Sequence, residues 1–322
     1  MSDVLVTGGA GFLGSHVAEA LVARGEAVTG LDNFDPFYER AVKERNLAGL
    51  RASPRFRFVE GDIRDGRLLR DVIGRDTLVV HLAARAGVRP SVEDPELYAS
   101  VNVGGSVAVL EAMRTAGARS LVFAGSSSVY GDSAPVPFHE AWPAMEPISP
   151  YAATKRAAEL LCATYAHLFG VRSISLRFFT AYGPRQRPDL AIHKFTRLIA
   201  AGRPVPCYGD GSTERDYTYV DDIVAGVMAA VAWARQAGAA FEVVNLGESR
   251  TTRLDRLIAL IGAALGRTPA IEYLPPQPGD VRRTWADISK ARALLGYAPT
   301  TTVEDGIPRF VRWYEDTYGR QT

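Results

Sequence analysis

The sequence is poor in the residues that mark secreted, metal-binding or polyanion-binding proteins. Cys162 and Cys207 are too few for a disulfide framework, and the five histidines show no ligand spacing, so we predict no metal. His81 follows a strand-like run and is expected to be structural. A net charge of +1 predicts no nucleic-acid or anionic-membrane partner. No apolar stretch approaches the ~18 residues of a membrane span, and the N-terminus shows no signal peptide, so we expect a cytoplasmic protein.

Apolar runs alternate with helical patterns along the 322 residues. Helices are predicted at 15–24, 101–116, 151–168 and 252–265. This alternation predicts an α/β fold of the Rossmann type, a doubly wound parallel sheet with helices on both faces. The strand-like runs are Val4-Leu5-Val6, Ala27–Leu31, Phe56–Val59, Leu78–Leu82, Leu121–Ala124, Ser173–Phe178 and Phe241–Leu246.

The character of the chain changes after Thr180, where prolines interrupt the pattern. We therefore predict a first domain over 1–180, to which part of 225–250 returns. Residues 181–322 are predicted to form mainly a smaller C-terminal α/β substrate-binding domain.

A glycine-rich turn joins the first strand to the first helix. Gly8, Gly11 and Gly14 have the spacing G-x-x-G-x-x-G, which allows a tight bend and close approach of a pyrophosphate to the helix N-terminus. Asp32 ends the second strand, where a carboxylate accepts hydrogen bonds from ribose hydroxyls and repels a 2′-phosphate. The pattern predicts NAD as the cofactor rather than NADP.

Tyr151 and Lys155 lie four residues apart, so both face one side of a helix that Ser149 and Pro150 begin. We expect the ammonium of Lys155 to lower the pKa of the Tyr151 phenol. Such a phenol can remove a proton from a sugar hydroxyl while hydride leaves the same carbon.

Together these motifs resemble an extended short-chain dehydrogenase/reductase that acts on nucleotide sugars, from end to end of the chain. Within this family the chain is most similar to the UDP-glucuronate 4-epimerases. One departure is Arg85, where relatives often have a glutamine. The motifs that carry the resemblance are residues 7–14, 32–38, 61–63, 81–84, 86–89, 126–131, 151–155, 177–189 and 215–217.

The resemblance implies roles for individual residues. Tyr151, Lys155 and Ser126 would be catalytic, and Lys155 would also hold the nicotinamide ribose. Asp62 and Ile63 would hold the adenine. The full cofactor set would be Gly8, Gly11, Phe12, Leu13, Gly14, Asp32, Asn33, Asp62, Ile63, Leu82, Ala83, Ala84, Tyr151 and Lys155. The UDP-sugar set would be Arg89, Ser126, Ser127, Ser128, Tyr151, Thr180, Arg187 and Arg215, with Arg215 on the diphosphate.

The resemblance predicts interconversion of UDP-glucuronate and UDP-galacturonate through a transient 4-keto sugar. Such a β-keto acid loses carbon dioxide unless its carboxylate is held near the carbonyl plane, which Ser127, Ser128 and Thr180 could do as hydroxyl donors. Related decarboxylases have a glutamate where Ser128 stands. Related 4,6-dehydratases have an Asp-Glu pair in place of Ser127 and Ser128, and serine cannot replace a carboxylate as a proton shuttle.

Three alternatives remain at this stage. A UDP-glucose/UDP-galactose 4-epimerase would share the catalytic set, although Gln277 stands where such an enzyme often has a phosphate-binding arginine. A UDP-glucuronate decarboxylase is disfavoured by Ser128. A catalytically silent NAD-binding protein would be expected to lack Tyr151 or Lys155. The apolar faces of the helices at 101–116 and 151–168 predict, by resemblance, a homodimer that pairs them.

Overall fold

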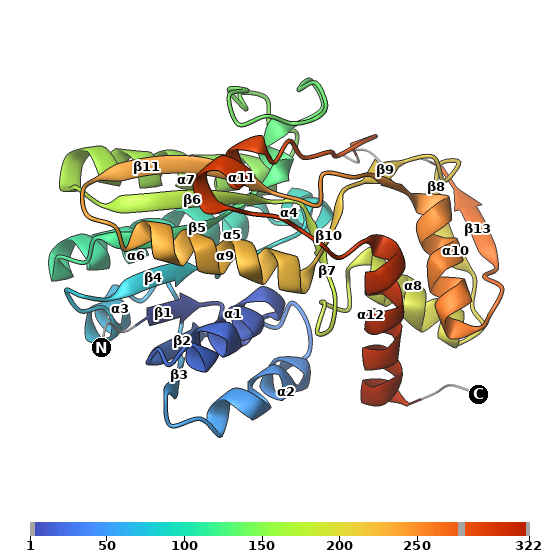
Figure 1. The fold of residues 1–322 in the computed structure, drawn as a ribbon, viewed down its shortest axis with the longest axis horizontal. Helices are drawn as coiled ribbons and strands as arrows, with labels where there is room; N and C mark the ends of the chain where they lie inside the picture. The colour runs from blue at the N-terminus through green and yellow to red at the C-terminus, as the bar shows by residue number, and fades with distance from the viewer. Residues whose placement is uncertain (1–3, 276–280, 320–322) are drawn as a thin grey trace.

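The computed structural model describes residues 4–275 and 281–319. At its centre is a seven-stranded parallel sheet with the order β11-β6-β5-β4-β1-β2-β3 (Figure 1). The predicted doubly wound parallel sheet is therefore confirmed. Its strands are β1 (Val4–Thr7), β2 (Val28–Asp32), β3 (Phe56–Glu60), β4 (Leu78–His81), β5 (Ser120–Ser126), β6 (Arg172–Phe178) and β11 (Ala240–Leu246).

Helices cover both faces of the sheet. Successive side chains of each strand point to opposite faces, and because both sets are apolar, both faces must be buried. In β1, Val4 and Val6 pack into one core cluster and Leu5 into another. The first cluster lies under α1 (Phe12–Ala23), α2 (Arg40–Arg51), α9 (Val220–Ala234) and α11 (Ser289–Leu295). The second lies under α3 (Gly66–Val72), α6 (Gly105–Ala116) and α7 (Pro150–Phe169).

The order of the strands places a crevice at the carboxyl end of β1. The chain leaves β1 for α1 on one face, whereas it leaves β4 for α6 on the other face. Between two connections that depart in opposite directions, an open parallel sheet leaves space for a ligand. Between β4 and α6 lie two short helices and one π-helical segment: α4 (Val88–Glu93), α5 (Pro95–Tyr98) and η1 (Ala99–Gly104).

A second layer of the molecule stands over this edge (Figure 1). Its core cluster is formed mainly by α8 (Ala191–Ala200), α10 (Leu254–Leu265) and α12 (Val303–Tyr318). Three two-stranded sheets complete it. They pair β7 (Thr180–Tyr182) with β10 (Tyr217–Tyr219), β9 (Glu214–Arg215) with β12 (Thr252–Arg253), and β8 (Val205–Tyr208) with β13 (Ile271–Leu274).

The chain returns from this layer to the central sheet more than once. Strand β11 is the last strand of the sheet, beside β6, and α9 packs against α1. Ile288, Ala291 and Tyr297 also join the first core cluster. The division of the chain into two domains at residue 180 stays a prediction.

Two predicted helices begin later than the sequence pattern indicated. The pattern from residue 101 includes part of the π-helical segment η1, which precedes α6. The pattern from residue 252 begins with the short strand β12, which pairs with β9 before α10 starts at Leu254. Gln277 lies outside the described residues.

The predicted homodimer would pair the apolar faces of α6 and α7 with those of a second copy. Leu160 and Leu168 of α7 are 51% and 60% exposed, but pairing of these helices in a homodimer stays a prediction. Within residues 4–275 and 281–319, no helix combines the length and apolar character needed to cross a membrane. The same residues contain no group of three or more His, Cys, Asp or Glu side chains placed to hold a metal ion.

Asp216 ties three segments of the chain together beneath the second layer. Its carboxylate is fully buried and accepts hydrogen bonds from the backbone N–H groups of Glu248 (2.8 Å), Ser249 (3.0 Å) and Ala286 (3.1 Å). Thr218 Oγ1 donates a fourth, at 3.2 Å. Burial raises the pKa of Asp216 to about 6, while these donors favour the carboxylate.

Replacing Asp216 by asparagine tests this junction. Asp216→Asn keeps the size of the side chain but presents an NH2 group to backbone N–H donors. Loss of two buried hydrogen bonds should lower the free energy of unfolding by about 3 kcal/mol. Thermal unfolding at pH 7 measures the effect, with Asp76→Asn at an exposed position as the control. Equal melting temperatures for the two variants would contradict the proposed role of Asp216.

Candidate active site

A cavity of ≈ 500 Å³ opens at the carboxyl edge of the sheet, where β1 and β4 end. All predicted cofactor residues line it, as do Ser126, Ser127, Ser128, Thr180 and Arg187. Arg89 and Arg215 are absent from its lining. The structure therefore brings together most of the predicted site, which the sequence spreads over some 180 positions.

The glycine turn is shaped so that larger side chains would not fit. Gly8 has φ +72°, which favours glycine. A Cβ atom on Gly14 would lie 2.0 Å from the backbone oxygen of Gly8, so α1 packs directly on the turn that precedes it. This close packing leaves the N-terminus of α1 facing the cavity, where backbone N–H groups can receive a phosphate.

Asp32 ends β2 with its carboxylate held by the neighbouring backbone. It accepts hydrogen bonds from Phe34 N (2.9 Å) and Ala10 N (3.2 Å), and Lys43 Nζ lies 3.6 Å away. The carboxylate is thus oriented in advance at the position where a ribose would lie.

A second carboxylate, that of Asp62, follows β3 on the same rim of the cavity. Arg64 donates to both of its oxygens, at 2.9 and 2.7 Å, and Asn33 Nδ2 donates at 3.0 Å. The Arg64 hydrogen bonds lower the pKa of Asp62 to about 2. Asp62 is therefore ionised at neutral pH and can accept a hydrogen bond from an adenine amino group.

Tyr151 stands in the first turn of α7, where Ser149 caps the helix through a 3.1 Å bond from Ala152 N to Ser149 Oγ. Burial raises the pKa of the Tyr151 phenol, while a hydrogen bond with Ser126 and the charge of Arg187 lower it. Burial also lowers the pKa of Lys155 to about 8, and Lys155 Nζ donates to Ala124 O at 2.8 Å.

The expectation that Lys155 lowers the pKa of Tyr151 is therefore wrong for this structure. The helical spacing does place both residues on the cavity, but the Lys155 ammonium donates to the carbonyl of Ala124, and Lys155 is not among the groups that shift the pKa of Tyr151. The cation that does act on Tyr151 is Arg187. Sequence spacing could not reveal this, because Arg187 comes from the second layer.

The three serines lie where β5 ends and the chain turns into a short 3₁₀ helix, η2 (Ser127–Tyr130). Ser126 Oγ donates to Ser128 Oγ at 3.1 Å and accepts from Ser128 N at 3.2 Å. These contacts fix the hydroxyl of Ser126 beside Tyr151 and keep all three serines on the cavity wall.

A buried ion pair fixes α7 against this turn. Glu159 of α7 accepts from Arg177 of β6 at 2.7 and 3.0 Å, and both side chains are almost fully buried. The Arg177 guanidinium lies 4.7 Å from the ring centre of Tyr130 in η2, and Tyr130 OH donates to Asn245 of β11 at 2.7 Å. This chain of contacts joins the helix of Tyr151 to the turn of Ser126.

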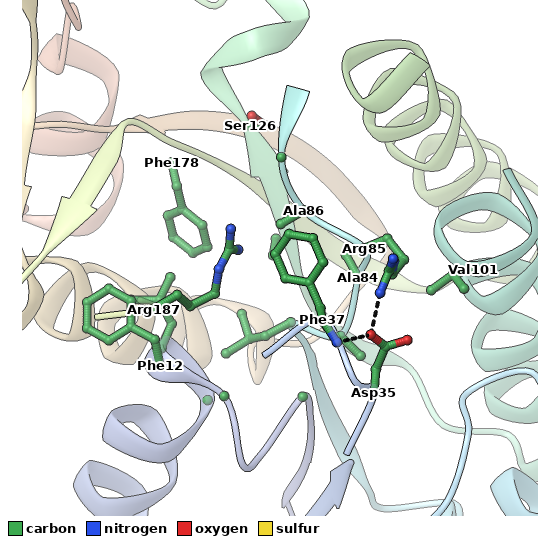
Figure 2. A pocket seen from close by; sticks show the side chains of 18 of the residues that line it. Phe12, Asp35, Phe37, Ala84, Arg85, Ala86, Val101, Ser126, Phe178 and Arg187 are labelled. Atoms are coloured by element: carbon green, nitrogen blue, oxygen red, sulfur yellow. Dashed lines mark hydrogen bonds and ion pairs between the residues drawn. The ribbon is translucent and has the colours of Figure 1, made fainter. Parts of the chain in front are cut away.

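The arginines predicted to bind substrate lie in different surroundings. Arg187 points into the cavity beside Phe178 (Figure 2) and is paired with Asp189 through its Nε and Nη2 atoms, at 2.9 and 2.7 Å. Arg89 lies over the ring of Tyr208, at 4.8 Å. Arg215 donates to the backbone oxygen of Glu214 at 2.9 Å. Their roles stay predictions.

His81 is buried and bonded on both ring nitrogens, to Thr7 Oγ1 at 2.7 Å and Ser106 Oγ at 3.1 Å. Burial lowers its pKa to about 3, so the ring is neutral and holds β1, β4 and α6 together. A structural role fits this geometry.

Asn102, in the π-helical segment η1, is a residue of the site that the sequence does not mark. Its side chain accepts from Arg85 N at 2.8 Å and donates to Arg85 O at 3.0 Å and Thr154 Oγ1 at 3.0 Å. It thereby fixes the loop after β4 to α7. No local pattern marks this residue, because the irregular turn that positions it is set by long-range contacts.

Comparison with known proteins agrees with this geometry. Residues 5–310 match the family model described as GDP-mannose 4,6 dehydratase. A UDP-glucuronate 4-epimerase of Thermodesulfobacterium geofontis is 40% identical over 319 residues, covering 98% of this chain and 97% of the relative.

Two solved structures have the same fold. The UDP-glucuronic acid 4-epimerase of Bacillus cereus, in complex with UDP-glucuronic acid and NAD, gives a TM-score of 0.90 at 34% identity and covers 98% of this chain and all of its own. The UDP-glucose 4-epimerase of Thermotoga maritima, with UDP-glucose, gives 0.86 at 32% identity and covers 98% of this chain and 99% of its own.

The chain belongs to the NAD-dependent epimerase/dehydratase family of extended short-chain dehydrogenases/reductases. Within that family it groups with the UDP-sugar 4-epimerases, as the names of these three relatives indicate.

Removing the Ser126 hydroxyl should shift the pH dependence of turnover. The hydrogen bond with Ser126 lowers the pKa of Tyr151, so Ser126→Ala should move the acid limb of kcat/KM to higher pH. The loss of one hydrogen bond to the reacting groups should also reduce kcat by about tenfold. A pH–rate profile measures both effects, and Ser133→Ala, at an exposed position outside the cavity lining, is the control. An unshifted limb in Ser126→Ala would contradict the assignment.

Proposed function

We propose that this protein interconverts UDP-glucuronate and UDP-galacturonate by epimerisation at C4, with NAD as its bound cofactor. The observation that carries the proposal is the wall of hydroxyl groups formed by Ser126, Ser127, Ser128 and Thr180. They line the same cavity as Tyr151 and Arg187, and no carboxylate stands at the serine positions.

The residues of the cavity suit NAD. The glycine turn, whose close packing excludes side chains, admits a pyrophosphate beside the N-terminus of α1. Asp32 would hold the adenosine ribose, Asp62 and Ile63 the adenine, and Lys155 the nicotinamide ribose. When bound, NAD supplies a reversible acceptor for the hydride at C4 of the sugar.

Tyr151 would remove the proton of the C4 hydroxyl, helped by the Ser126 hydroxyl on the same sugar oxygen. The resulting 4-keto sugar would turn about its phosphate linkage and present its other face. Return of hydride to C4, and of the proton from Tyr151 to the oxygen, gives the opposite configuration. No net oxidation occurs, so the same cofactor molecule serves every turnover.

The hydroxyl wall would also protect the intermediate. In a 4-keto uronate the C5 carboxylate is β to the ketone, and carbon dioxide leaves fastest when its bond is perpendicular to the carbonyl plane. Ser127, Ser128 and Thr180 would hold the carboxylate near that plane, and Arg187 would neutralise its charge. The absence of an Asp-Glu pair at Ser127 and Ser128 argues against dehydration, despite the description of the family model.

Incubation with UDP-glucuronate, without added NAD, tests the proposal. We expect proton NMR to show UDP-galacturonate and no pentose. UDP-xylose or a 4-keto pentose would show decarboxylation instead. No reaction with UDP-glucuronate, together with conversion of UDP-glucose, would transfer the assignment to the neutral-sugar 4-epimerases.

The variant Tyr151→Phe tests the mechanism in the same assay. It retains the ring that packs edge-on against Tyr98, with centroids 6.3 Å apart, and should fold and bind NAD. Without the phenolic proton carrier, turnover should fall at least about a hundredfold. Activity above roughly one-tenth of the wild type would refute the role of Tyr151 as the base.

Arg187 is the residue on which preference for an acidic sugar should depend. Arg187→Ala should lower kcat/KM for UDP-glucuronate about tenfold more than for UDP-glucose, because only the former offers a carboxylate for a charge-assisted bond. The control is Arg185→Ala, which breaks a 2.9 Å ion pair with Glu19 outside the cavity lining. If both substrates lose equally, Arg187 does not bind the carboxylate, and its effect lies on the nucleotide or on the Tyr151 phenol.

A further inference from the structure

Two loops that flank the cavity are joined by an ion pair between Asp35 and Arg85. Asp35 lies in the loop after β2 and Arg85 in the loop after β4, and both residues line the cavity. In the sheet, β2 and β4 lie on either side of β1, the strand that ends in the glycine turn. A link between their loops therefore connects the two sides of the trough in which a dinucleotide would lie.

Both partners of this pair are held in place by their own loops. Asp35 Oδ1 also accepts from Phe37 N at 2.9 Å, and Lys43 Nζ donates to Asp35 O at 3.1 Å. On the other side, Asn102 bonds both the backbone N–H and the carbonyl of Arg85. The side chains of Arg85 and Asp35 are only 17% and 27% exposed, so water and salt screen the pair less than a surface pair.

The ring of Phe37 lies between two arginines (Figure 2). Its centroid is 4.9 Å from the guanidinium carbon of Arg85 and 5.2 Å from that of Arg187. A cation near an aromatic ring is attracted to it, so the ring extends the link from the loop after β4 to Arg187 in the segment between β7 and α8.

We propose that Asp35, Phe37 and Arg85 form a clasp that retains the dinucleotide between turnovers. This inference rests on the proposed function, because an epimerase must return the hydride that it has removed before the cofactor dissociates. Phe37 and the pair of Asp35 and Arg85 would keep the loops after β2 and β4 together, so that release requires the pair to open. The three act as positioning residues.

The rate of NADH release tests the clasp without any sugar. The purified protein would be loaded with NADH and chased with excess NAD, and the decay of NADH fluorescence followed. Asp35→Asn and Arg85→Gln should each release NADH about tenfold faster than the wild type. The matched control is Arg253→Gln, which breaks a 2.7 Å ion pair with the exposed Asp255, outside the cavity lining.

A double variant separates the clasp from two unrelated structural effects. If one interaction is responsible, the variant carrying both substitutions should release NADH no faster than either single variant. Thermal unfolding would verify that all variants are folded. The variants should also depend on added NAD in the turnover assay, whereas the wild type should not.

The outcomes for the clasp and for the proposed function are distinct. Release rates equal to the wild type, or independent additive effects of the two substitutions, would overturn the clasp and leave the epimerase proposal standing. Faster release from both variants, with no reaction of UDP-glucuronate in the wild type, would support the clasp and refute the substrate. A wild type that binds no NADH and releases no dinucleotide on denaturation would overturn the clasp together with the assignment of the cofactor.

Discussion

The buried pair of Glu159 and Arg177 is the interaction on which the geometry of the site depends. It joins the helix that carries Tyr151 to the strand beside the serine turn, and the ring of Tyr130 below Arg177 extends the contact to that turn. Removing one charge of such a pair leaves the other buried and unpaired, which costs about 3–5 kcal/mol. Its importance lies in fixing one relative position of base and hydroxyl.

The central sheet could be predicted from the sequence because each strand is marked by its own short apolar run. The placement of Tyr151 and Lys155 on one cavity followed from local spacing in the same way. The ammonium of Lys155 points elsewhere than expected, since its direction depends on a carbonyl of β5. Periodicity gives no sign of contacts between segments that are distant in sequence. Three features of the structure depend on such contacts: the hydrogen bonds of Asn102, the ion pair of Asp35 with Arg85, and the junction at Asp216.

The site also shows why family membership leaves the reaction open. The same fold and the same Tyr and Lys accompany dehydration, decarboxylation and epimerisation, and the small residues after β5 distinguish these outcomes by the resemblance. In this chain they are serines, and the hydroxyl of Ser126 bonds to the hydroxyl and to the backbone N–H of Ser128. Such groups can orient a substrate oxygen, but they cannot carry a proton away from carbon at neutral pH. The serine positions of this chain therefore lack the carboxylates that, by the resemblance, related dehydratases and decarboxylases have there.

Phe37 has a consequence for the thermodynamics of the two ligands. Its ring is shared by Arg85, in the loop after β4, and Arg187, which we propose contacts the sugar. A ligand that orders the ring through one arginine would also order the other arginine. The binding free energies of the cofactor and of the sugar would then be coupled. Coupling of this kind is reciprocal: whatever factor the cofactor adds to the affinity for the sugar, the sugar adds to the affinity for the cofactor. The dinucleotide would then be held more tightly while a sugar nucleotide is bound than in the empty enzyme.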